Sequence, residues 1–331
     1  MAEPVASGSE ELVLAFLAEA GDEFVSGEAI SDKLGLSRAA VWKHVNALRG
    51  MGYRIDAVPA RGYRLVEIPD RLTALELRPL LGTHDLGQVL HCFEEVGSTS
   101  DAAKELAEAG AGHGEVVIAE RQTAGRGRRG RSWSSPAGKN LYLSAVLRPD
   151  LPPQRAPELT LVASVALCQV VREAGVEAGI KWPNDILRGG KKLAGILTEL
   201  AAEPEAIQWV VLGIGVNLNG RPEDFPEELR AGATSLAVER GQPVPRALFV
   251  AALLTRLEEW LDRHAEEGFE PVREAWREHS ATLGREVHVL SEGAELDGVA
   301  EDIDERGALL VRTGAGLTRV VSGDVRLLRL R

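Results

Sequence analysis

The chain has 331 residues, of which 44% are hydrophobic and 27% charged, and its formal net charge is −12. This length favours two or three domains. No apolar run reaches the ~18 residues of a transmembrane helix, and the acidic beginning of the chain lacks the basic region of a signal peptide. Cys92 and Cys168 form no CxxC motif, so we expect a cytoplasmic protein with no disulfide frame, metal site or membrane association.

Residues 1–68 are predicted to form a winged helix-turn-helix domain. A first helical pattern ends at Gly21, and Ser26 and Ser37 can cap two further helices that are separated by a tight turn. Two alternating segments, YRIDAV and RGYRLVE, then flank a turn at residues 59–62, as the paired strands of a wing do.

One segment of this first domain reverses the charge of the whole chain. The run from Lys33 to Arg64 contains seven Lys and Arg residues and one acidic residue. Val41, Val45 and Leu48 share one face of the third helix and should be core. The outward side of that helix and the wing turn then become candidates for contacts with DNA. The candidate DNA-binding residues are Arg38, Ala39, Lys43, Asn46 and Arg61. The alternative is a helical interaction module with a solvated basic face.

The rest of the chain divides into three predicted parts. Residues 69–85, with mixed polarity and prolines, should be a linker. Residues 86–283 alternate strand and helix patterns, which predicts an α+β domain with a mixed central sheet. Within it, residues 185–197 predict a hairpin that turns at Gly189-Gly190. Residues 284–331 form short strands with turn signals, as in a small SH3-like β-barrel.

The stretch GRGRRGRSW, residues 125–133, is the strongest chemical signal. Its arginines, Arg126, Arg128, Arg129 and Arg131, stay charged near neutral pH and can bind carboxylate or phosphate with two hydrogen bonds each. Because four like charges repel one another, we expect the empty loop to be extended and mobile, and a ligand with several negative charges to order it. The alternative is a disordered RNA-binding segment, which a position between two buried strands disfavours.

Three further motifs follow in the same predicted α+β domain. Residues 181–186, KWPNDI, place an amide and a carboxylate at a turn. Residues 191–197, KKLAGIL, read as a strand in which alternation puts Lys192 on the face of Ala194 and Ile196, where it either reaches a buried anion or lies along the surface. Residues 213–219, GIGVNLN, carry two glycines in an apolar strand, which indicates a ligand wall or only an irregular strand.

Together, and in this order, GSTS, Gln122, GRGRRGRSW, KWPND, KKLAGIL and GIGVNLN resemble the motif series of the biotin protein ligases. SRAAVWKHVNALRGMGYRIDAVPARGYRL resembles the amino-terminal domain of the bifunctional form, which also represses biotin genes. The resemblance covers nearly the full length. It implies that residues 86–283 adopt the class II synthetase-like fold shared by biotin and lipoate ligases.

The resemblance also implies an activity. Such ligases form biotinyl-5′-AMP from biotin, ATP and Mg²⁺, and then acylate a lysine of the biotin carboxyl carrier protein of acetyl-CoA carboxylase. In the bifunctional form, the adenylate is the corepressor, and the adenylate-bound homodimer binds operator DNA of biotin genes. Here Gly189-Gly190 and the flanking loops are candidate parts of the dimer interface.

Residue by residue, the matching positions receive roles. The catalytic set is Arg126, Arg128, Lys192 and Asp185, of which Asp185 orients the incoming lysine or a ligand group. The biotin-binding set is Ser98, Thr99, Ser100, Gln122, Arg126, Gly127, Arg128, Trp133, Lys192 and Gly195. The adenylate-binding set is Arg128, Arg129, Arg131, Lys181, Asn184, Asn217 and Arg329. The carboxyl end is one residue longer than the family's usual motif, so Arg326 competes with Arg329 for the adenine side.

Three rival interpretations stay open at this point. The ligase domain could be a catalytically dead biotin sensor that only represses. The chain could be a ligase whose first domain no longer binds DNA. A lipoate ligase shares a related fold, but that group lacks the winged helix and GRGRRGRSW.

Overall fold

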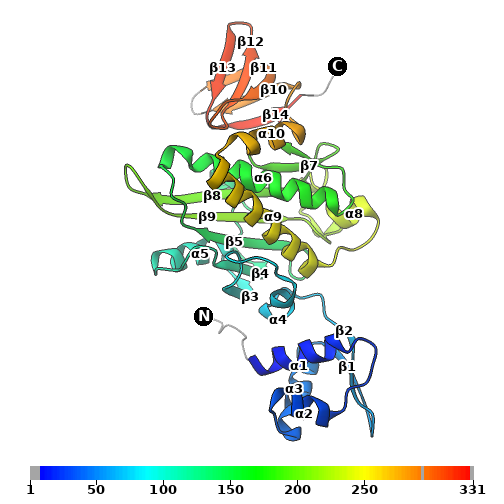
Figure 1. Cartoon of the computed structure of the whole chain (residues 1–331). Helices are drawn as coiled ribbons and strands as arrows, with labels where there is room; N and C mark the ends of the chain where they lie inside the picture. The colour runs from blue at the N-terminus through cyan, green and yellow to red at the C-terminus, as the bar shows by residue number, and fades with distance from the viewer. Residues whose placement is uncertain (1–7, 292–293, 329–331) are drawn as a thin grey trace. The chain divides into compact units, whose positions relative to one another are not determined.

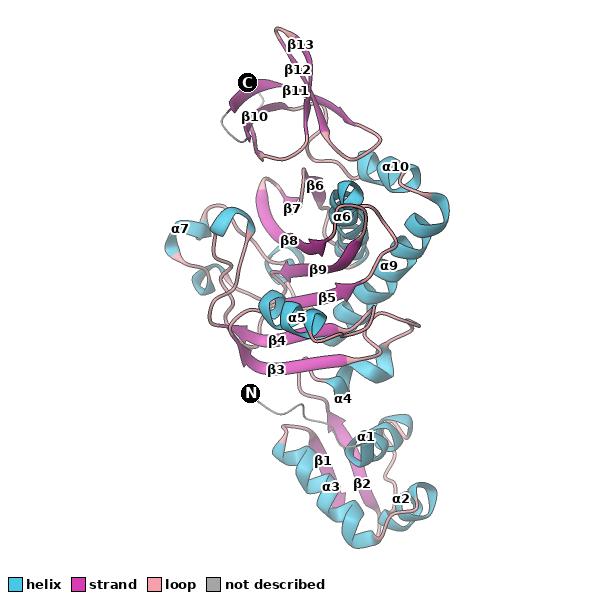
Figure 2. Ribbon diagram, turned by 90° about the vertical axis from the view of Figure 1, so that its left-hand side faces the viewer, coloured by secondary structure: helices cyan, strands magenta, loops and turns pink. Residues whose placement is uncertain are grey.

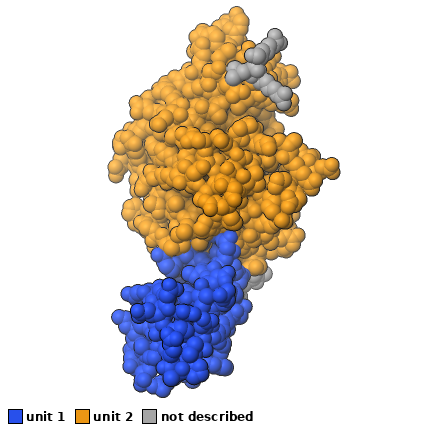
Figure 3. All heavy atoms as spheres, turned by 90° about the vertical axis from the view of Figure 1, so that its right-hand side faces the viewer, with its two compact units in different colours: residues 1–79 blue, residues 80–331 orange. Residues whose placement is uncertain are grey.

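The computed structural model describes residues 8–291 and 294–328. They belong to two compact units, residues 1–79 and residues 80–331, which Figure 3 shows in different colours. Among the described residues, no helix combines the length and the apolar character needed to cross a membrane.

The first unit is three helices followed by a hairpin (Figure 1). Ser26 and Ser37 cap α2 and α3 as predicted, since their hydroxyls accept hydrogen bonds from the backbone N–H groups of Ala29 at 3.0 Å and Ala40 at 3.2 Å. The elements are α1 (Gly8–Glu19), α2 (Gly27–Leu34), α3 (Arg38–Gly50), β1 (Arg54–Val58), β2 (Gly62–Glu67) and the short α4 (Ala74–Leu77).

The core of this unit lies where the helical spacing placed it. Val41, Val45 and Leu48 of α3 are fully buried among residues of α1, α2 and β1. The antiparallel pair β1–β2 forms the wing. At its turn, the guanidinium group of Arg61 lies 4.3 Å from the centre of the Phe24 ring, a cation–π contact that steadies this arginine.

The second unit is built on a seven-stranded sheet of order β3-β4-β5-β9-β8-β7-β6, in which β3 and β4 are parallel and the other neighbours antiparallel. Its strands are β3 (Leu90–Val96), β4 (Val116–Gln122), β5 (Leu141–Leu147), β6 (Gly179–Lys181), β7 (Asp185–Arg188), β8 (Lys191–Ala202) and β9 (Ile207–Val216). The predicted hairpin with Gly189-Gly190 at its turn is the β7–β8 connection.

Helices cover both faces of this sheet (Figure 2). α5 packs on β4, β5 and β9, and α6 packs on β6, β7 and β8 with α9 behind it. A buried ion pair joins α9 to the sheet, because Arg246 bonds the Glu120 carboxylate at 2.8 Å. The helices are α5 (Thr99–Glu108), α6 (Ala156–Glu173), α7 (Glu227–Arg230), α8 (Leu236–Arg240), α9 (Arg246–Glu267) and α10 (Glu270–Glu278), with short 3₁₀ turns at Arg78–Leu80, Arg128–Gly130, Pro153–Arg155 and Pro222–Asp224.

The chain ends in a five-stranded antiparallel sheet of order β13-β12-β11-β10-β14. Its strands are β10 (Glu286–Ser291), β11 (Ala294–Ile303), β12 (Leu309–Thr313), β13 (Gly316–Val320) and β14 (Asp324–Leu327). The indole N–H of Trp182 donates to the carbonyl of Gly307 at 2.9 Å, so this small domain is tied to the central sheet near the KWPND motif. The predicted α+β class, with a winged helix, a mixed sheet and a terminal β-domain, is confirmed.

Candidate active site

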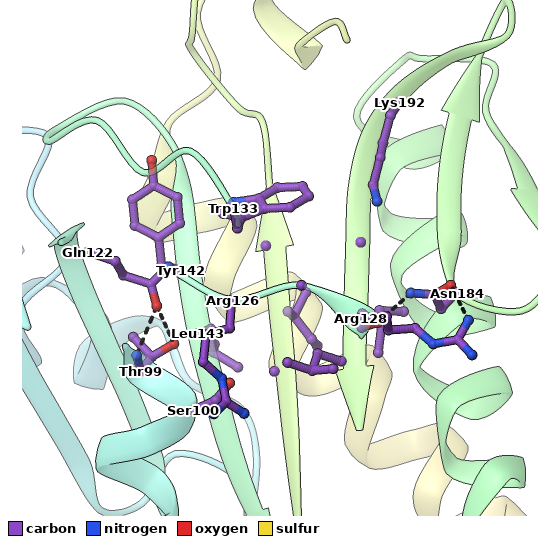
Figure 4. Close-up of a pocket in the computed structure, with 17 residues that line it drawn as sticks. Thr99, Ser100, Gln122, Arg126, Arg128, Trp133, Tyr142, Leu143, Asn184 and Lys192 are labelled. Carbon is purple, nitrogen blue, oxygen red and sulfur yellow. Dashed lines mark hydrogen bonds between the residues drawn. The ribbon is translucent and has the colours of Figure 1, made fainter. Parts of the chain in front are cut away.

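Two adjoining cavities open on the face of the sheet that carries α5. The smaller, about 50 Å³, lies between the start of α5, the arginine loop (residues 125–133) and strands β8 and β9 (Figure 4). The larger, about 360 Å³, lies between the arginine loop, the KWPND turn and β14. Five residues line both cavities: Gly127, Arg128, Trp133, Asn184 and Lys192. A ligand that spans the two cavities must therefore lie next to these five residues.

The floor of the smaller cavity is a network of hydroxyl and amide groups (Figure 4). The Oε1 of Gln122 accepts hydrogen bonds from the backbone N–H of Thr99 at 2.8 Å and from its hydroxyl at 3.1 Å. The Nε2 of Gln122 donates to Ser135 at 2.9 Å, and the Ser144 hydroxyl donates to Thr99 at 2.9 Å. This floor therefore offers fixed donors and acceptors to a polar group of a ligand.

Ser98 and Ser100 flank this network at the beginning of α5. Ser100 lines the smaller cavity and shares a hydrogen bond with Ser144 at 3.2 Å. Ser98 holds the N-cap position without a capping bond from its side chain, and its buried hydroxyl has no hydrogen-bond partner among the described residues. Buried hydroxyls are normally paired, so the Ser98 hydroxyl remains available for one more bond.

Two glycines let Trp133 lie flat against the sheet. A Cβ on Gly215 would lie 2.6 Å from Cε2 of Trp133, and a Cβ on Gly195 would lie 3.2 Å from its Cζ3 and 3.1 Å from Nζ of Lys192. These glycines are paired across β8 and β9. Gly195 of KKLAGIL and Gly215 of GIGVNLN are thus explained by the close approach of the indole ring rather than by a turn, whereas a Cβ on Gly213 would lie 2.7 Å from the Ser100 hydroxyl.

Lys192 lies on the opposite face of β8 from the one that simple alternation predicts. The pairing with β7 shifts register, so that Leu187 faces Lys192 and Ile186 faces Ala194, leaving Leu193 as an extra residue. Such a bulge reverses the order of the two faces. Lys192 therefore shares its face with Gly195 and contacts Trp133, with Nζ 5.3 Å from the ring centre.

Lys192, Asp185 and Lys181 form a chain of charges beside the larger cavity. The Asp185 carboxylate lies 2.6 Å from Nζ of Lys192 and 3.0 Å from Nζ of Lys181. Burial alone would raise the pKa of Asp185, but the two ammonium groups hold it below its ordinary value. The carboxylate is therefore ionised at neutral pH and fixes both lysines in place.

The first arginine of the loop, Arg126, is paired within the unit. Its guanidinium lies 2.9 Å from the Asp101 carboxylate of α5 and also bonds Glu199 of β8, which in turn bonds Lys104 at 2.6 Å. Arg126 lines the smaller cavity, but its charge is already balanced.

The last two arginines of the loop bind the terminal β-domain. Arg131 forms an ion pair with Asp324 of β14, and Arg129 lies 3.7 Å from the same carboxylate and donates to the carbonyl of Leu290 at 3.2 Å. Arg129 has a positive φ of 56°, and its side chain lines neither cavity. The sequence alone indicated only repulsion among the four arginines. The structure adds carboxylates from α5, β8 and β14 that offset it.

Arg128 differs from its neighbours, because its partner is a neutral amide. Its Nη1 donates to Oδ1 of Asn184 at 3.1 Å, and the amide of Asn184 is held by the carbonyl of Ile196 at 2.7 Å. Burial lowers the pKa of Arg128, but guanidinium groups keep their proton near neutral pH. Within the described part of the loop, Arg128 is thus the arginine whose charge has no direct carboxylate partner, and it lines both cavities.

The predicted sets can now be placed. Of the biotin-binding set, every residue except Ser98 lines the smaller cavity. Of the adenylate-binding set, Arg128, Arg131, Lys181, Asn184 and Asn217 line the larger one, whereas Arg129 does not and Arg329 lies outside the described residues. Arg326, the competitor of Arg329, does line it. Asn217 holds the wall together, since its amide donates to the carbonyl of Thr234 at 3.1 Å.

Sequence reasoning missed the apolar walls. The smaller cavity also includes Tyr142, Leu143, Ile196, Leu197 and Ile214, and the larger one includes Phe225, Leu229, Ala233 and Val325. These residue types read as core in a sequence. The segment 225–233 is separated from the end of GIGVNLN by five residues, and its closeness in sequence to that motif was the available signal.

The predicted DNA-binding residues lie together on the first unit. Arg38, Ala39 and Lys43 are exposed on α3 and Asn46 is half-buried there, while Arg61 is exposed at the wing turn. Arg38 bonds Glu28 at 2.7 Å. The described residues thus present a basic helix and a basic wing, as a winged helix does when it binds a duplex.

The fold and the site define a class of protein. A helix-turn-helix unit is joined to a mixed-sheet enzyme domain whose cation-lined double cavity suits the joining of two anions, as in a ligase. Three family models match the chain: "HTH domain" over residues 10–64, "Biotin/lipoate A/B protein ligase family" over residues 93–217 and "Biotin protein ligase C terminal domain" over residues 282–328.

Individual relatives agree with these matches. The chain is 42% identical to the bifunctional ligase/repressor BirA of Bacillus subtilis over 95% of this chain and 97% of that protein, and 34% identical to that of Escherichia coli over 93% and 94%. The structure of a biotin protein ligase from Aquifex aeolicus in complex with biotin and ATP superposes with a TM-score of 0.64 at 31% identity, covering 73% of this chain and 100% of that one. The chain belongs to the biotin protein ligase family, in its bifunctional ligase/repressor form.

Proposed function

We propose that the two cavities bind biotin and ATP side by side and join them. A carboxylate oxygen of biotin attacks the α-phosphorus of ATP, the bond to the β-phosphate breaks, and pyrophosphate leaves with biotinyl-5′-AMP formed. A lysine amine of the biotin carboxyl carrier protein then attacks the acyl carbon, and AMP leaves. The observation that supports this most is that Arg128 and Lys192 line both cavities, where the two anions would meet.

The smaller cavity suits biotin. Its hydroxyl and amide floor, with Thr99, Ser100 and Gln122, provides donors and acceptors for a urea group, and Ser98 has an unused hydroxyl beside it. Its walls, with Leu143, Ile196 and Leu197, suit an apolar ring and chain.

The larger cavity suits the nucleotide. Arg128, Arg131 and Lys181 provide positive charge for the phosphates, and Asn217 and Arg326 also line this cavity. Negative charge that develops on pyrophosphate would be stabilised by these fixed cations. Asp185 acts as a positioning residue for Lys192 and Lys181 and does not need to exchange a proton.

Mg²⁺ is proposed to arrive with ATP, where it offsets the charge of the phosphates. Carboxylates are the protein ligands that Mg²⁺ prefers, and Asp185, Glu228 and Asp324 line the larger cavity. Asp185 and Asp324 already pair with cationic side chains, so Glu228 is the carboxylate that fits best. The group of His84, Asp85 and Glu258 elsewhere lines neither cavity, and Glu258 already accepts three backbone hydrogen bonds.

Repression is assigned to residues 1–68, ligation to residues 86–283 and closure of the nucleotide side to residues 284–331. We propose that the adenylate-bound chain forms a homodimer through β8. Beyond Ile196, β8 pairs with β9 on one side and has no strand on the other among the described residues. Such an edge can pair with a second chain. A cytoplasmic site of action is proposed with this function.

The deciding experiment is mass spectrometry of a carrier-protein fragment after incubation with the full chain, ATP, Mg²⁺ and biotin. A mass increase of one biotinyl group supports the proposed ligase activity. An unchanged mass together with tight binding of biotin would instead favour the interpretation as a catalytically dead biotin sensor. Addition of lipoate instead of biotin is the control, and no lipoyl product is expected. A gel shift with biotin-operon promoter DNA separates the repressor from a ligase that has lost DNA binding.

A further inference from the structure

Trp42 is the most exposed large apolar side chain among the described residues. It lies in α3 and keeps 62% of its surface exposed. Single exposed apolar residues are common, but tryptophan has the largest apolar surface to lose from water. Trp42 lies in the second helix of the helix-turn-helix, which enters the major groove in proteins of this architecture. An exposed side chain on this helix can therefore contact base pairs.

The surroundings of Trp42 are those of a contact surface. Val41, Val45 and Leu48 bury the other side of α3, so the core makes no use of the indole ring. Ala39 and Lys43 are exposed on the same outward side, with Asn46 one turn further along. We call these four residues, Ala39, Trp42, Lys43 and Asn46, the α3 surface. It combines two apolar side chains, one cation and one amide.

The charge around this surface favours a nucleic acid over a protein as its partner. Lys43 has no carboxylate partner in the part of the chain that the structure describes, and neither has Arg61, whose guanidinium lies on Phe24. Arg38 bonds Glu28, and Arg49 donates to the carbonyl of Ile55 at 2.6 Å. Basic side chains without internal partners attract the phosphates of a duplex.

We infer that Trp42 and Ala39 read thymine methyl groups in the major groove, so that the α3 surface selects A·T pairs. The thymine methyl is the apolar group that a base pair presents there, and apolar side chains contact it. Asn46 adds an amide, which pairs with adenine, and Lys43 contacts phosphate. The inference rests on the proposed DNA-binding function and adds to it the residue that reads sequence.

The test is a selection experiment with the full chain. With biotin, ATP and Mg²⁺ present, the chain is incubated with a pool of duplexes that carry random sequence, and bound DNA is sequenced through several rounds. The parent is expected to enrich a half-site with A·T pairs. Trp42→Ala should lose that preference at one or two positions and bind the enriched duplex about tenfold more weakly, the cost of one mismatched pair.

Three comparisons make the result specific. Leu12→Ala removes another exposed apolar side chain, 53% accessible, from α1 of the same unit, and this variant should bind as the parent does. Lys43→Ala should weaken binding to the enriched duplex and to a scrambled duplex alike, because phosphate contacts carry no sequence information. Uracil in place of thymine, which removes only the methyl group, should weaken binding by the parent more than binding by Trp42→Ala, which keeps only the Ala39 contact.

The outcomes of this experiment distinguish a failure of the inference about Trp42 from a failure of the proposed DNA binding. If the parent enriches no sequence, the proposed DNA binding is wrong and the inference with it. If the parent enriches a sequence and Trp42→Ala enriches the same one with equal affinity, DNA binding stands and the inference alone is overturned; Trp42 would then be a contact for a protein. The uracil duplex keeps the test valid even if the variant folds poorly, because thymine and uracil binding by the parent alone must differ.

Discussion

The Nζ of Lys192 lies 2.6 Å from the carboxylate of Asp185, at the wall that both cavities share. The register shift in β8 brings the lysine to this face, and the KWPND turn supplies the carboxylate. A lysine that is fixed before substrate binds loses little freedom on binding, which is how a preorganised site favours a transition state.

The first prediction concerns acid. The folded-state pKa of Asp185 lies below its ordinary value of 3.8, so this carboxylate stabilises the fold above that pH, and the stabilisation is lost as the pH falls through the folded-state pKa. Asp185→Asn should lower the free energy of unfolding by about 2 kcal/mol at neutral pH, less than for a fully buried pair because Lys192 is partly exposed. Urea unfolding of both proteins at several pH values measures the difference.

That difference should shrink as the pH falls from 3.8 towards the lower folded-state pKa of Asp185, through which the parent loses its own ion pair. Asp297→Asn, which breaks an exposed contact with His288, is the matched control and should change little at any pH. A gap between parent and Asp185→Asn that stays constant down to strong acid would show that Asp185 is not held ionised by the lysines.

The second prediction concerns retention of the adenylate. Arg128 lines both cavities and lacks a direct carboxylate partner, so it is expected to bind the mixed anhydride of biotin and AMP. Arg128→Gly should release labelled biotinyl-5′-AMP about 30-fold faster and biotinylate bystander proteins at random. Arg129→Gly changes the neighbouring arginine, whose positive φ glycine accepts, and should retain the adenylate. Equal release from the parent and Arg128→Gly would refute this role.

The third prediction concerns the order of the arginine loop. Asp324 holds Arg131 and Arg129 against the terminal β-domain. Asp324→Asn should therefore make the ligand-free chain several times more sensitive to trypsin at the loop arginines, and biotin with ATP should restore protection. Cleavage sites identified by mass spectrometry, with Glu301→Gln as a control within the same domain, distinguish the loop from general unfolding. Unchanged cleavage at the loop would mean that Asp324 does not restrain it.

The fourth prediction concerns the contact between Trp133 and the sheet. Gly215→Ala would place a methyl group 2.6 Å from the indole ring, which must shift. We expect biotin to bind about tenfold more weakly, the cost of overpacking a closed site. Gly112→Ala is the control, since the nearest atom to its Cβ would lie at an ordinary 3.7 Å. Titration calorimetry measures both, and unaltered biotin binding by Gly215→Ala would show that the ring has room.

Much of the site could be predicted because its polar residues occur in short, unusual runs. Gln122, Arg128 and Asn184 carry groups that have little use in a core, and each lies where a strand or loop meets a cavity. The winged helix could be predicted equally well, because the capping residues Ser26 and Ser37 mark where α2 and α3 begin.

What could not be predicted depends on contacts between distant parts of the chain. The face of Lys192 was predicted wrongly, because a bulge is a property of two paired strands and not of one strand's pattern. The carboxylates that pair with the loop, Asp101, Glu199 and Asp324, lie up to 193 residues from their arginines. Apolar wall residues such as Leu143 look like core until a cavity is seen beside them.

The internal partners of Arg126 and Arg131 have a consequence for selectivity. A chloride or a single inorganic phosphate gains little by entering, because each must compete with a carboxylate that is attached to the protein and so is always present at high local concentration. A ligand with several linked negative charges can replace several of these carboxylates at their arginines in a single binding step. The number of linked negative charges on a ligand, more than its affinity for any one guanidinium group, then decides which anions occupy the two cavities.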